Sequence, residues 1–204
     1  AETGKRIAEL YRETDAKYVE PTHPILFLPW NANQFIMLSQ KDGYNHIYLF
    51  NKDGKQIKQI TKGNWVVMDV LGFNSKAKSI VYVSNECSPI QRNTWSVNVE
   101  NGIRTLLDNG RGYHNATLSD GGKYLVDNYT EPTVPRKIDI TTIGTHPTIK
   151  NWLTAKDPWS GFNLPEYSSG SLKADDGTTD LYWRMVKPIG FDPSKKYPTV
   201  IYVY

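Results

Sequence analysis

The sequence predicts a mainly β protein in which a four-strand unit recurs about three times. The apolar strands FIMLS, IVYVS and YLVDN begin at Phe35, Ile80 and Tyr124, roughly 45 residues apart, a period typical of β-propeller blades. Aromatic residues make up 12% of the chain, which favours strands over helices. Asp53-Gly54 and Asn101-Gly102 are dipeptides preferred in type I′ hairpin turns. We therefore expect a partial propeller of about three four-stranded blades.

The stretch from Lys5 to Glu13 precedes the repeat, and its pattern fits two structures. Ile7, Glu9 and Tyr11 share one face of a strand, whereas Ile7, Leu10 and Tyr11 form a helical stripe. Periodicity alone leaves this choice open.

Each repeat has the same order of an inner strand, a polar turn, an apolar strand, a loop and a final hairpin. The aligned segments are Trp65–Met68 with Tyr113–Ala116 for the inner strands, 74–76 with 120–122 for the turns, and strands starting at His46, Asn93 and Arg136 for the hairpins. In the third unit, residues 141–144 replace a clean hairpin turn. Three blades are too few to close a ring, so we expect the chain alone to be marginally stable or oligomeric.

Residues 145–171 form a junction that contains three prolines. A short helix is expected over Ile149–Ala155. Ser168–Ser171 taken alone is typical of a flexible linker. A strand then leads to a turn at Asp175–Thr178, and Leu181–Val186 returns as a second strand.

The final stretch, Gly190 to Tyr204, combines a polar turn with an uncharged run. Asp192-Pro193-Ser194 predicts the turn. Thr199 to Tyr204 is β-branched and aromatic, as in a strand buried on both faces of a mostly parallel sheet. A domain does not end by exposing its most buried strand, so we expect the chain to be a fragment.

Composition excludes several classes of function. The net charge is +3, from 24 basic and 21 acidic residues spread along the chain, so no nucleic-acid footprint is predicted. Cys87 is the only cysteine, which rules out an internal disulfide or a cysteine-based metal cluster. The four histidines, His23, His46, His114 and His146, lack a second ligand at metal spacing, and local packing or exposure is expected for them.

The motif MVKPIGFDPSKKYPTVIYVY, Met185 to Tyr204, resembles the entry to the catalytic domain of the prolyl oligopeptidase clan. The branch with dipeptidyl peptidase IV and bacterial prolyl tripeptidyl peptidase fits best. Upstream, GYNHIYLF, ITKGNW and YVSNE are similar to the late propeller blades of that branch. The resemblance implies C-terminal propeller blades over 1–148, a junction over 149–165, and the first strands of a truncated α/β-hydrolase domain over 166–204. It also implies a hairpin, not a linker, around residues 168–171, and favours the last strand of a blade for the N-terminal stretch.

The resemblance implies that the parent protein is a serine exopeptidase that removes dipeptides or tripeptides after proline from peptide N-termini. Tyr204 matches the family's tyrosine that donates a hydrogen bond to the oxyanion. Without the resemblance, core packing is the simpler reading of Tyr204, and it is our reading of Tyr202. No G-x-S-x-G motif for the nucleophile occurs, so the chain should lack the Ser-Asp-His triad and be inactive.

Substrate-binding residues stay unassigned at this point. Glu86 fits a turn cap better than an amine-binding carboxylate, and the family's propeller arginine has no counterpart near Glu20 and Pro21. The resemblance implies peptide partners with proline near the N-terminus and no metal or organic cofactor. It is compatible with a homodimeric parent that is periplasmic or secreted. The rival hypothesis is a non-enzymatic propeller that binds proteins, because blades alone fix no function.

Overall fold

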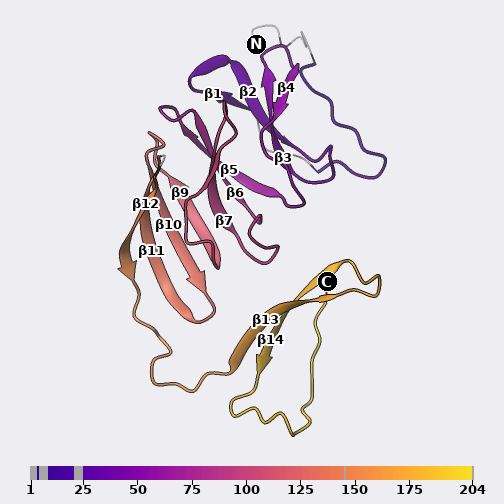
Figure 1. The fold of residues 1–204 in the computed structure, drawn as a ribbon, viewed down its shortest axis with the longest axis vertical. Helices are drawn as coiled ribbons and strands as arrows, with labels where there is room; N and C mark the ends of the chain where they lie inside the picture. Colours follow the sequence, from indigo (N-terminus) through magenta and orange to yellow (C-terminus); the bar gives the residue numbers. More distant parts are fainter. Residues whose placement is uncertain (1–3, 5–8, 21–24, 145, 204) are drawn as a thin grey trace. The chain divides into compact units, whose positions relative to one another are not determined.

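The computed structural model describes residues 4, 9–20, 25–144 and 146–203, and these contain strands but no helix. The chain divides into two compact units, residues 1–156 and 157–204. The first unit holds three four-stranded sheets, and the second holds one two-stranded sheet (Figure 1). The predicted mainly β fold with a repeated four-strand unit is confirmed.

Each four-stranded sheet is an antiparallel meander with its strands in chain order. The first sheet consists of β1 (Leu26–Leu28), β2 (Asn31–Ser39), β3 (His46–Asn51) and β4 (Gln56–Gln59). The second consists of β5 (Val67–Asn74), β6 (Ser79–Ser84), β7 (Asn93–Asn98) and β8 (Arg104–Leu106). The third consists of β9 (Tyr113–Leu118), β10 (Tyr124–Glu131), β11 (Val134–Thr142) and β12 (Thr148–Thr154).

Two seams of the core lie where the second sheet packs against the first and against the third, and a further buried cluster of the first sheet lies against Tyr11. Ile80 and Tyr82 of β6 belong to the cluster shared with the first sheet, whereas Val81 belongs to the cluster shared with the third. All three side chains are 0% exposed. A strand with neighbours on both faces needs apolar residues at every position, which explains the continuous run IVYV.

The hairpin turns differ from the predicted type I′ geometry. That turn needs positive φ at both central residues, but in the first turn only Gly54 has one, at 84°, and in the second only Gly102, at 74°. Gly54 N donates to Asn51 O at 3.0 Å and Asn51 N donates to Lys55 O at 2.9 Å, which encloses a three-residue loop. Such loops place one glycine in the left-handed region after an ordinary turn.

The helix predicted over Ile149–Ala155 is wrong, because this stretch forms the edge strand β12. Its residues pair with β11 from Thr142↔Thr148 to Lys137↔Thr154. A helix of seven residues is marginal in water. The edge of β11 offers a row of unpaired backbone groups that a strand satisfies.

The second unit contains a hairpin of β13 (Glu166–Lys173) and β14 (Asp180–Lys187). This confirms a hairpin in place of a flexible linker at residues 168–171. Asp176 closes its turn by accepting hydrogen bonds from the Thr179 hydroxyl at 2.5 Å and from the Thr179 and Thr178 amides, each at 2.8 Å, and these bonds lower the pKa of Asp176. No described residue of this unit is buried.

Two further sequence predictions fail in the described residues. Residues 199–203 form no strand, and Val200 to Val203 are 82–95% exposed. The reason is that no strand of the described chain pairs with them, and a strand without a partner leaves its backbone groups to water. Residues 9–13 form neither strand nor helix; residues 5–8 lie outside the described residues.

Candidate functional site

Residues 9–20 are fastened to the first sheet and form one wall of a pocket. Tyr11 packs edge-on against Phe50 with ring centroids 5.3 Å apart, and its hydroxyl lies 3.1 Å from Ser39 Oγ. The Glu13 carboxylate accepts hydrogen bonds from Ser39 Oγ and, at 3.1 Å, from the Gln40 amide. These contacts hold an irregular segment in a fixed place without any ladder of strand hydrogen bonds.

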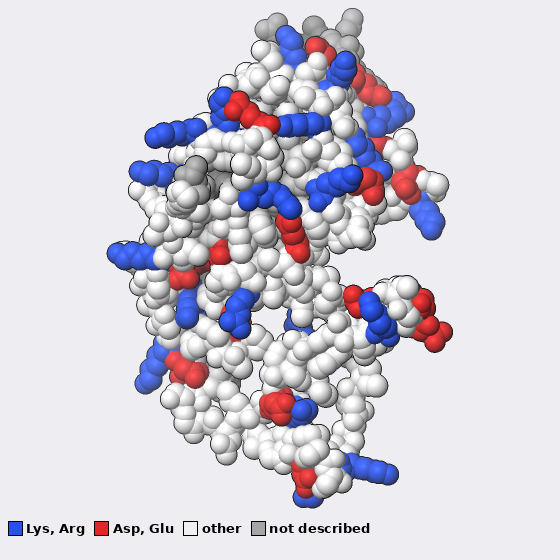
Figure 2. Space-filling view, in the orientation of Figure 1, with Lys and Arg blue, Asp and Glu red and all other residues white. Residues whose placement is uncertain are grey.

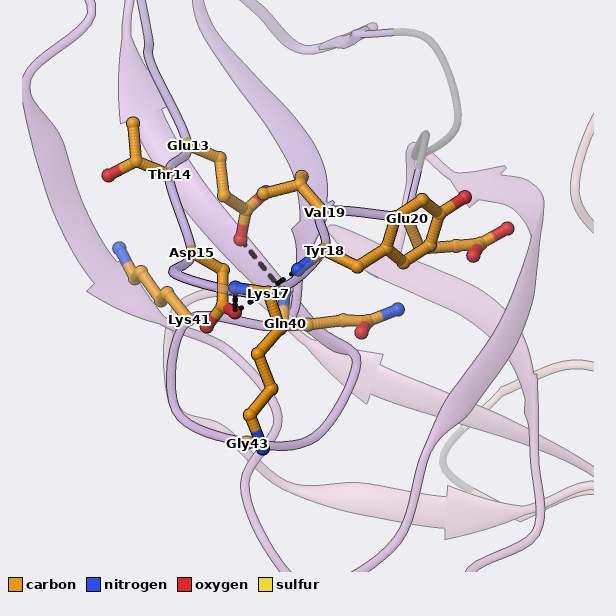
Figure 3. A pocket seen from close by; sticks show the side chains of 10 residues that line it. All are labelled: Glu13, Thr14, Asp15, Lys17, Tyr18, Val19, Glu20, Gln40, Lys41 and Gly43. Atoms are coloured by element: carbon orange, nitrogen blue, oxygen red, sulfur yellow. Dashed lines mark hydrogen bonds between the residues drawn. The ribbon is translucent and has the colours of Figure 1, made fainter.

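The pocket has a volume of about 410 Å³, and charged, polar and apolar side chains line it (Figure 3). Asp15 stabilises its turn, because Asp15 Oδ1 accepts from the Lys17 amide at 2.8 Å and the Tyr18 amide at 3.3 Å. These bonds lower the pKa of Asp15. The lining residues are Glu13, Thr14, Asp15, Lys17, Tyr18, Val19, Glu20, Gln40, Lys41 and Gly43.

The lining of this pocket combines carboxylates and ammonium groups with the apolar surface of Tyr18 and Val19. Among the described residues that line it there is no serine, cysteine or histidine that could act as a nucleophile or its base. Lys17 and Lys41 supply the positive charges of the pocket lining. They line the same pocket as Glu20, and the family's propeller arginine has no counterpart near that residue. This pocket could not be predicted from the sequence, because it depends on how residues 13–20 fold against the turn after β2.

Glu86 is held by an ion pair and does not cap a turn, so the turn-cap prediction is wrong. Its carboxylate pairs with Arg104 across the β6 and β8 ends of the second sheet. The Arg104 guanidinium also lies 5.7 Å from the ring centre of Trp65 and 6.0 Å from that of Trp95. Burial, together with the Glu86 charge, raises the pKa of the neighbouring Tyr82. The Arg104 guanidinium is within cation–π distance of both rings, which stabilises this cluster.

The histidines of the first unit lie apart, and each meets only local partners. The His46 ring is buried, with Nδ1 3.1 Å from Thr61 Oγ1 and Nε2 2.9 Å from Gly63 O. His114 is buried with Nδ1 2.5 Å from Asp127 Oδ2. His146 is exposed, and His23 lies outside the described residues. No group of three or more His, Cys, Asp or Glu side chains suited to a metal ion occurs in the described part of the chain.

The predicted catalytic residue, Tyr204, lies outside the described residues. Tyr202, for which core packing was expected, is 82% exposed, so that reading is wrong for this structure. Cys87 is a free, exposed thiol in the loop after β6. Burial, with the Asp108 and Glu86 carboxylates, raises the pKa of Cys87, which disfavours the reactive thiolate.

Charge is mixed over the surface. On the face shown in Figure 2, basic and acidic side chains alternate, and no large area carries one sign. This agrees with the absence of a basic block in the sequence. Among the described residues, no helix reaches the length and apolarity that a membrane crossing requires.

A family model for the N-terminal region of dipeptidyl peptidase IV matches residues 1–136. The chain belongs to the dipeptidyl peptidase IV family. A relative from Trichophyton equinum named dipeptidyl peptidase 4 is 30% identical over 176 residues, which cover 83% of the chain. The chain matches only 22% of that relative's length.

Solved structures of this family share the fold. A Bacteroides ovatus protein described as a dipeptidyl aminopeptidase IV matches 90% of the chain and 29% of its own length, with a TM-score of 0.79 and 39% identity. Dipeptidyl peptidase 4 of Porphyromonas gingivalis matches 85% of the chain and 24% of its own length, with a TM-score of 0.72 and 27% identity. The three sheets of this dipeptidyl peptidase IV family member are therefore blades of a partial β-propeller, as the repeat predicted.

Proposed function

We propose that this chain is part of a serine exopeptidase that removes dipeptides or tripeptides after proline from peptide N-termini. The observation that supports it most directly is the family match over residues 1–136, together with homologues named dipeptidyl peptidase 4. Its three stacked four-stranded sheets are the blades that this match requires. The substrates are peptides with proline near the N-terminus.

The proposed division of labour assigns residues 1–148 to the propeller, 149–165 to the junction and 166–204 to the start of the hydrolase domain. The propeller gates access, because its walls admit only thin, unfolded peptide ends to the nucleophile. The hydrolase domain supplies serine, aspartate and histidine, and no metal or organic cofactor is needed for that triad. The 204-residue chain alone should be inactive, since its sequence contains no G-x-S-x-G motif.

Tyr204 is the residue of this chain to which we assign a catalytic role. Attack on the scissile carbonyl places a negative charge on its oxygen, and a hydroxyl donor aimed at that oxygen stabilises the transition state. Loss of one such donor typically lowers kcat by about 10²–10³-fold. The match of residues 185–204 to the entry of the catalytic domain is what supports the assignment.

The test uses the full-length parent protein with Gly-Pro and Ala-Ala-Pro chromogenic amides. We expect hydrolysis of one of them, and the preferred amide decides between dipeptide and tripeptide release. Tyr204→Phe should lower kcat by about 10²–10³-fold with little change in KM, whereas Tyr202→Phe, the matched control, should keep full turnover. Full turnover in Tyr204→Phe would show that Tyr204 has no catalytic role. If the parent protein cleaved neither amide, that result would favour a propeller that only binds proteins.

A further inference from the structure

The surroundings of His114 supply an acceptor to each ring nitrogen. Nε2 lies 2.6 Å from the backbone oxygen of Arg111, and a carbonyl oxygen can only accept, so Nε2 carries a proton. Nδ1 lies 2.5 Å from Oδ2 of Asp127. Both His114 and Asp127 are almost fully buried, at 1% and 2% exposure, so water does not replace either contact.

The short contact between His114 and Asp127 requires a second proton. If both Nδ1 and the carboxylate lacked it, a lone pair and a negatively charged oxygen would face each other at hydrogen-bond distance in a buried site. With the proton on Nδ1, the charged ring donates one charge-assisted hydrogen bond to the Asp127 carboxylate. The pair therefore binds one proton more than a neutral histidine beside an ionised aspartate.

Further charged and titratable groups face this pair from each element packed around it. Asp108, in the loop after β8, places Oδ2 3.8 Å from His114 Nδ1, so a second carboxylate favours the protonated ring. Tyr129 of β10 stacks on His114 at 4.9 Å between ring centres. The groups farther out are Arg111 in the same loop, Glu131 on the Tyr129 hydroxyl, Lys137 of β11 at 5.9 Å from the Tyr129 ring, Asp139 of β11 opposite Asp127, and Arg92 near Tyr113 of β9.

The balance of these effects favours the charged histidine. Burial alone would lower the pKa of His114, but the hydrogen bond to Asp127 and the charges of Asp108 and Asp127 together raise it. Burial raises the pKa of Asp108, and the His114 charge opposes that rise. The Asp108 carboxylate therefore stabilises the protonated ring of His114, and the charge of that ring stabilises the ionised form of Asp108.

His114 lies on the seam between the second and third sheets. Its amide donates to Arg92 O at 3.0 Å, and the Arg92 amide donates to Gly112 O at 3.3 Å, which joins the start of β7 to the start of β9. Asp108 accepts from the Thr94 amide of β7 at 2.6 Å. Asp108 therefore ties the proton-binding pair to the second sheet, while His114 and Asp127 belong to the third.

We propose that the proton shared by His114 and Asp127 is a latch on this seam, which is closed while the proton is bound and loosens when it leaves in alkaline solution. Without the proton, the carboxylates of Asp108 and Asp127 face an uncharged ring, and their desolvation is no longer offset. The latch makes the contact between two blades depend on pH. A propeller that gates access by the fit of its blades would then change its gate with pH.

The sign of the effect follows from the raised pKa of His114. Stability from the latch is fully present below the unfolded-state value of about 6.5 and is lost as the pH rises through the folded-state value. Between those values, the equilibrium constant for closing the seam falls about tenfold per pH unit. Outside this pH range, the latch does not make the equilibrium constant for closing the seam depend on pH.

The first test is an NMR titration of the unmodified 204-residue chain. At pH 6 to 7 we expect both ring nitrogens of His114 to be protonated, with loss of one proton above the usual range for histidine. Native-state hydrogen exchange, corrected for the intrinsic base-catalysed rate, should show that protection of the His114 and Arg92 amides falls by about tenfold per pH unit from about pH 6.5 up to the pH at which that proton is lost, and then levels off. Protection of the Asn51 amide, in the first sheet, should stay constant.

Two variants separate a latch from ordinary packing. Asp127→Asn removes the carboxylate and should return the His114 titration to the usual range or below it. His46→Gln is the matched control, since His46 is equally buried but is hydrogen-bonded to a hydroxyl and a carbonyl rather than a carboxylate; it should leave the pH profile at the seam unchanged. A singly protonated His114 ring at pH 6, or seam protection without the tenfold slope, would overturn the proposal.

Discussion

Gly122 marks a place where two sheets approach so closely that a side chain has no room. It has φ of +63°, and a Cβ added there would lie 1.9 Å from the backbone oxygen of Phe73 in β5. The turn between β9 and β10 therefore rests its backbone directly on the second sheet. A backbone oxygen cannot move away as a flexible side chain can, so the neighbouring sheets would have to separate.

We predict that Gly122→Ala lowers the free energy of unfolding by about 2 kcal/mol or more, from the left-handed backbone and the clash together. Gly121→Ala is the control from the same turn, because a Cβ at Gly121 meets nothing within 4 Å and its φ lies outside the left-handed region. That control should stay within about 0.5 kcal/mol of the parent chain. Urea unfolding followed by tryptophan fluorescence measures both, and equal stabilities would contradict the close approach.

Sequence reasoning at the level of single residues succeeded where a partner was not needed. A loop position for Cys87 follows from its place between the apolar strand that begins at Ile80 and the strand that begins at Asn93. The role of Glu86 could not be predicted, because its partner Arg104 is 18 positions away and meets it only when β6 and β8 join one sheet. His114 and Asp127 are separated by 13 positions, and only the pairing of β9 with β10 brings them together.

Strands of the first unit differ in how much each contributes to stability, because only some are covered on both faces. Ile80 in β6 is 0% exposed and lies in the core shared with the first sheet. Ile57 in β4 is 47% exposed, at the open edge of the first sheet. The same residue type therefore stands in two environments of the same unit.

We predict that Ile80→Ala lowers the free energy of unfolding by about 2–5 kcal/mol, since it removes buried methyl groups and leaves a cavity. Ile57→Ala, the same change at the exposed site, should cost less than about 0.5 kcal/mol. Thermal unfolding of both variants by circular dichroism gives the comparison. A larger loss of stability from Ile57→Ala than from Ile80→Ala would contradict the assignment of Ile80 to the core.

The elements that the sequence predicted correctly are those whose pattern is local. The inner apolar strands recur at a fixed spacing, so their existence needed no knowledge of packing. The strand Thr148–Thr154 was mistaken for a helix because seven residues between prolines carry too weak a period to decide, and the exposed edge of β11 decided instead. The strand expected after Pro198 failed for the converse reason, since its apolar run finds no neighbouring strand in the described chain.

At the scale of the whole first unit, the two outer sheets differ in how they are covered. Tyr11 packs on the buried cluster of Phe35, Tyr48 and Phe50 in the first sheet, whereas the third sheet exposes apolar side chains. On the third sheet, Tyr113 is 55% exposed, Tyr124 is 42% exposed and Val126 is 46% exposed. The pairing of β9 with β10 and β10 with β11 places Val126 opposite Thr117 and Ile140, so apolar side chains of three strands share this open face. A flat apolar sheet face of this kind favours association.

We predict that the chain associates with rising concentration through this face, and that Val126→Lys reduces the association because a charge would be buried at the contact. Ile103→Lys is the control: Ile103 is more exposed, at 64%, but it lies in the loop before β8 and away from the open face, so this variant should associate as the parent chain does. Light scattering across a tenfold range of concentration distinguishes the three proteins. A parent chain that stays monomeric throughout, with one cooperative melting transition, would show that three stacked blades are stable with their outer faces in water.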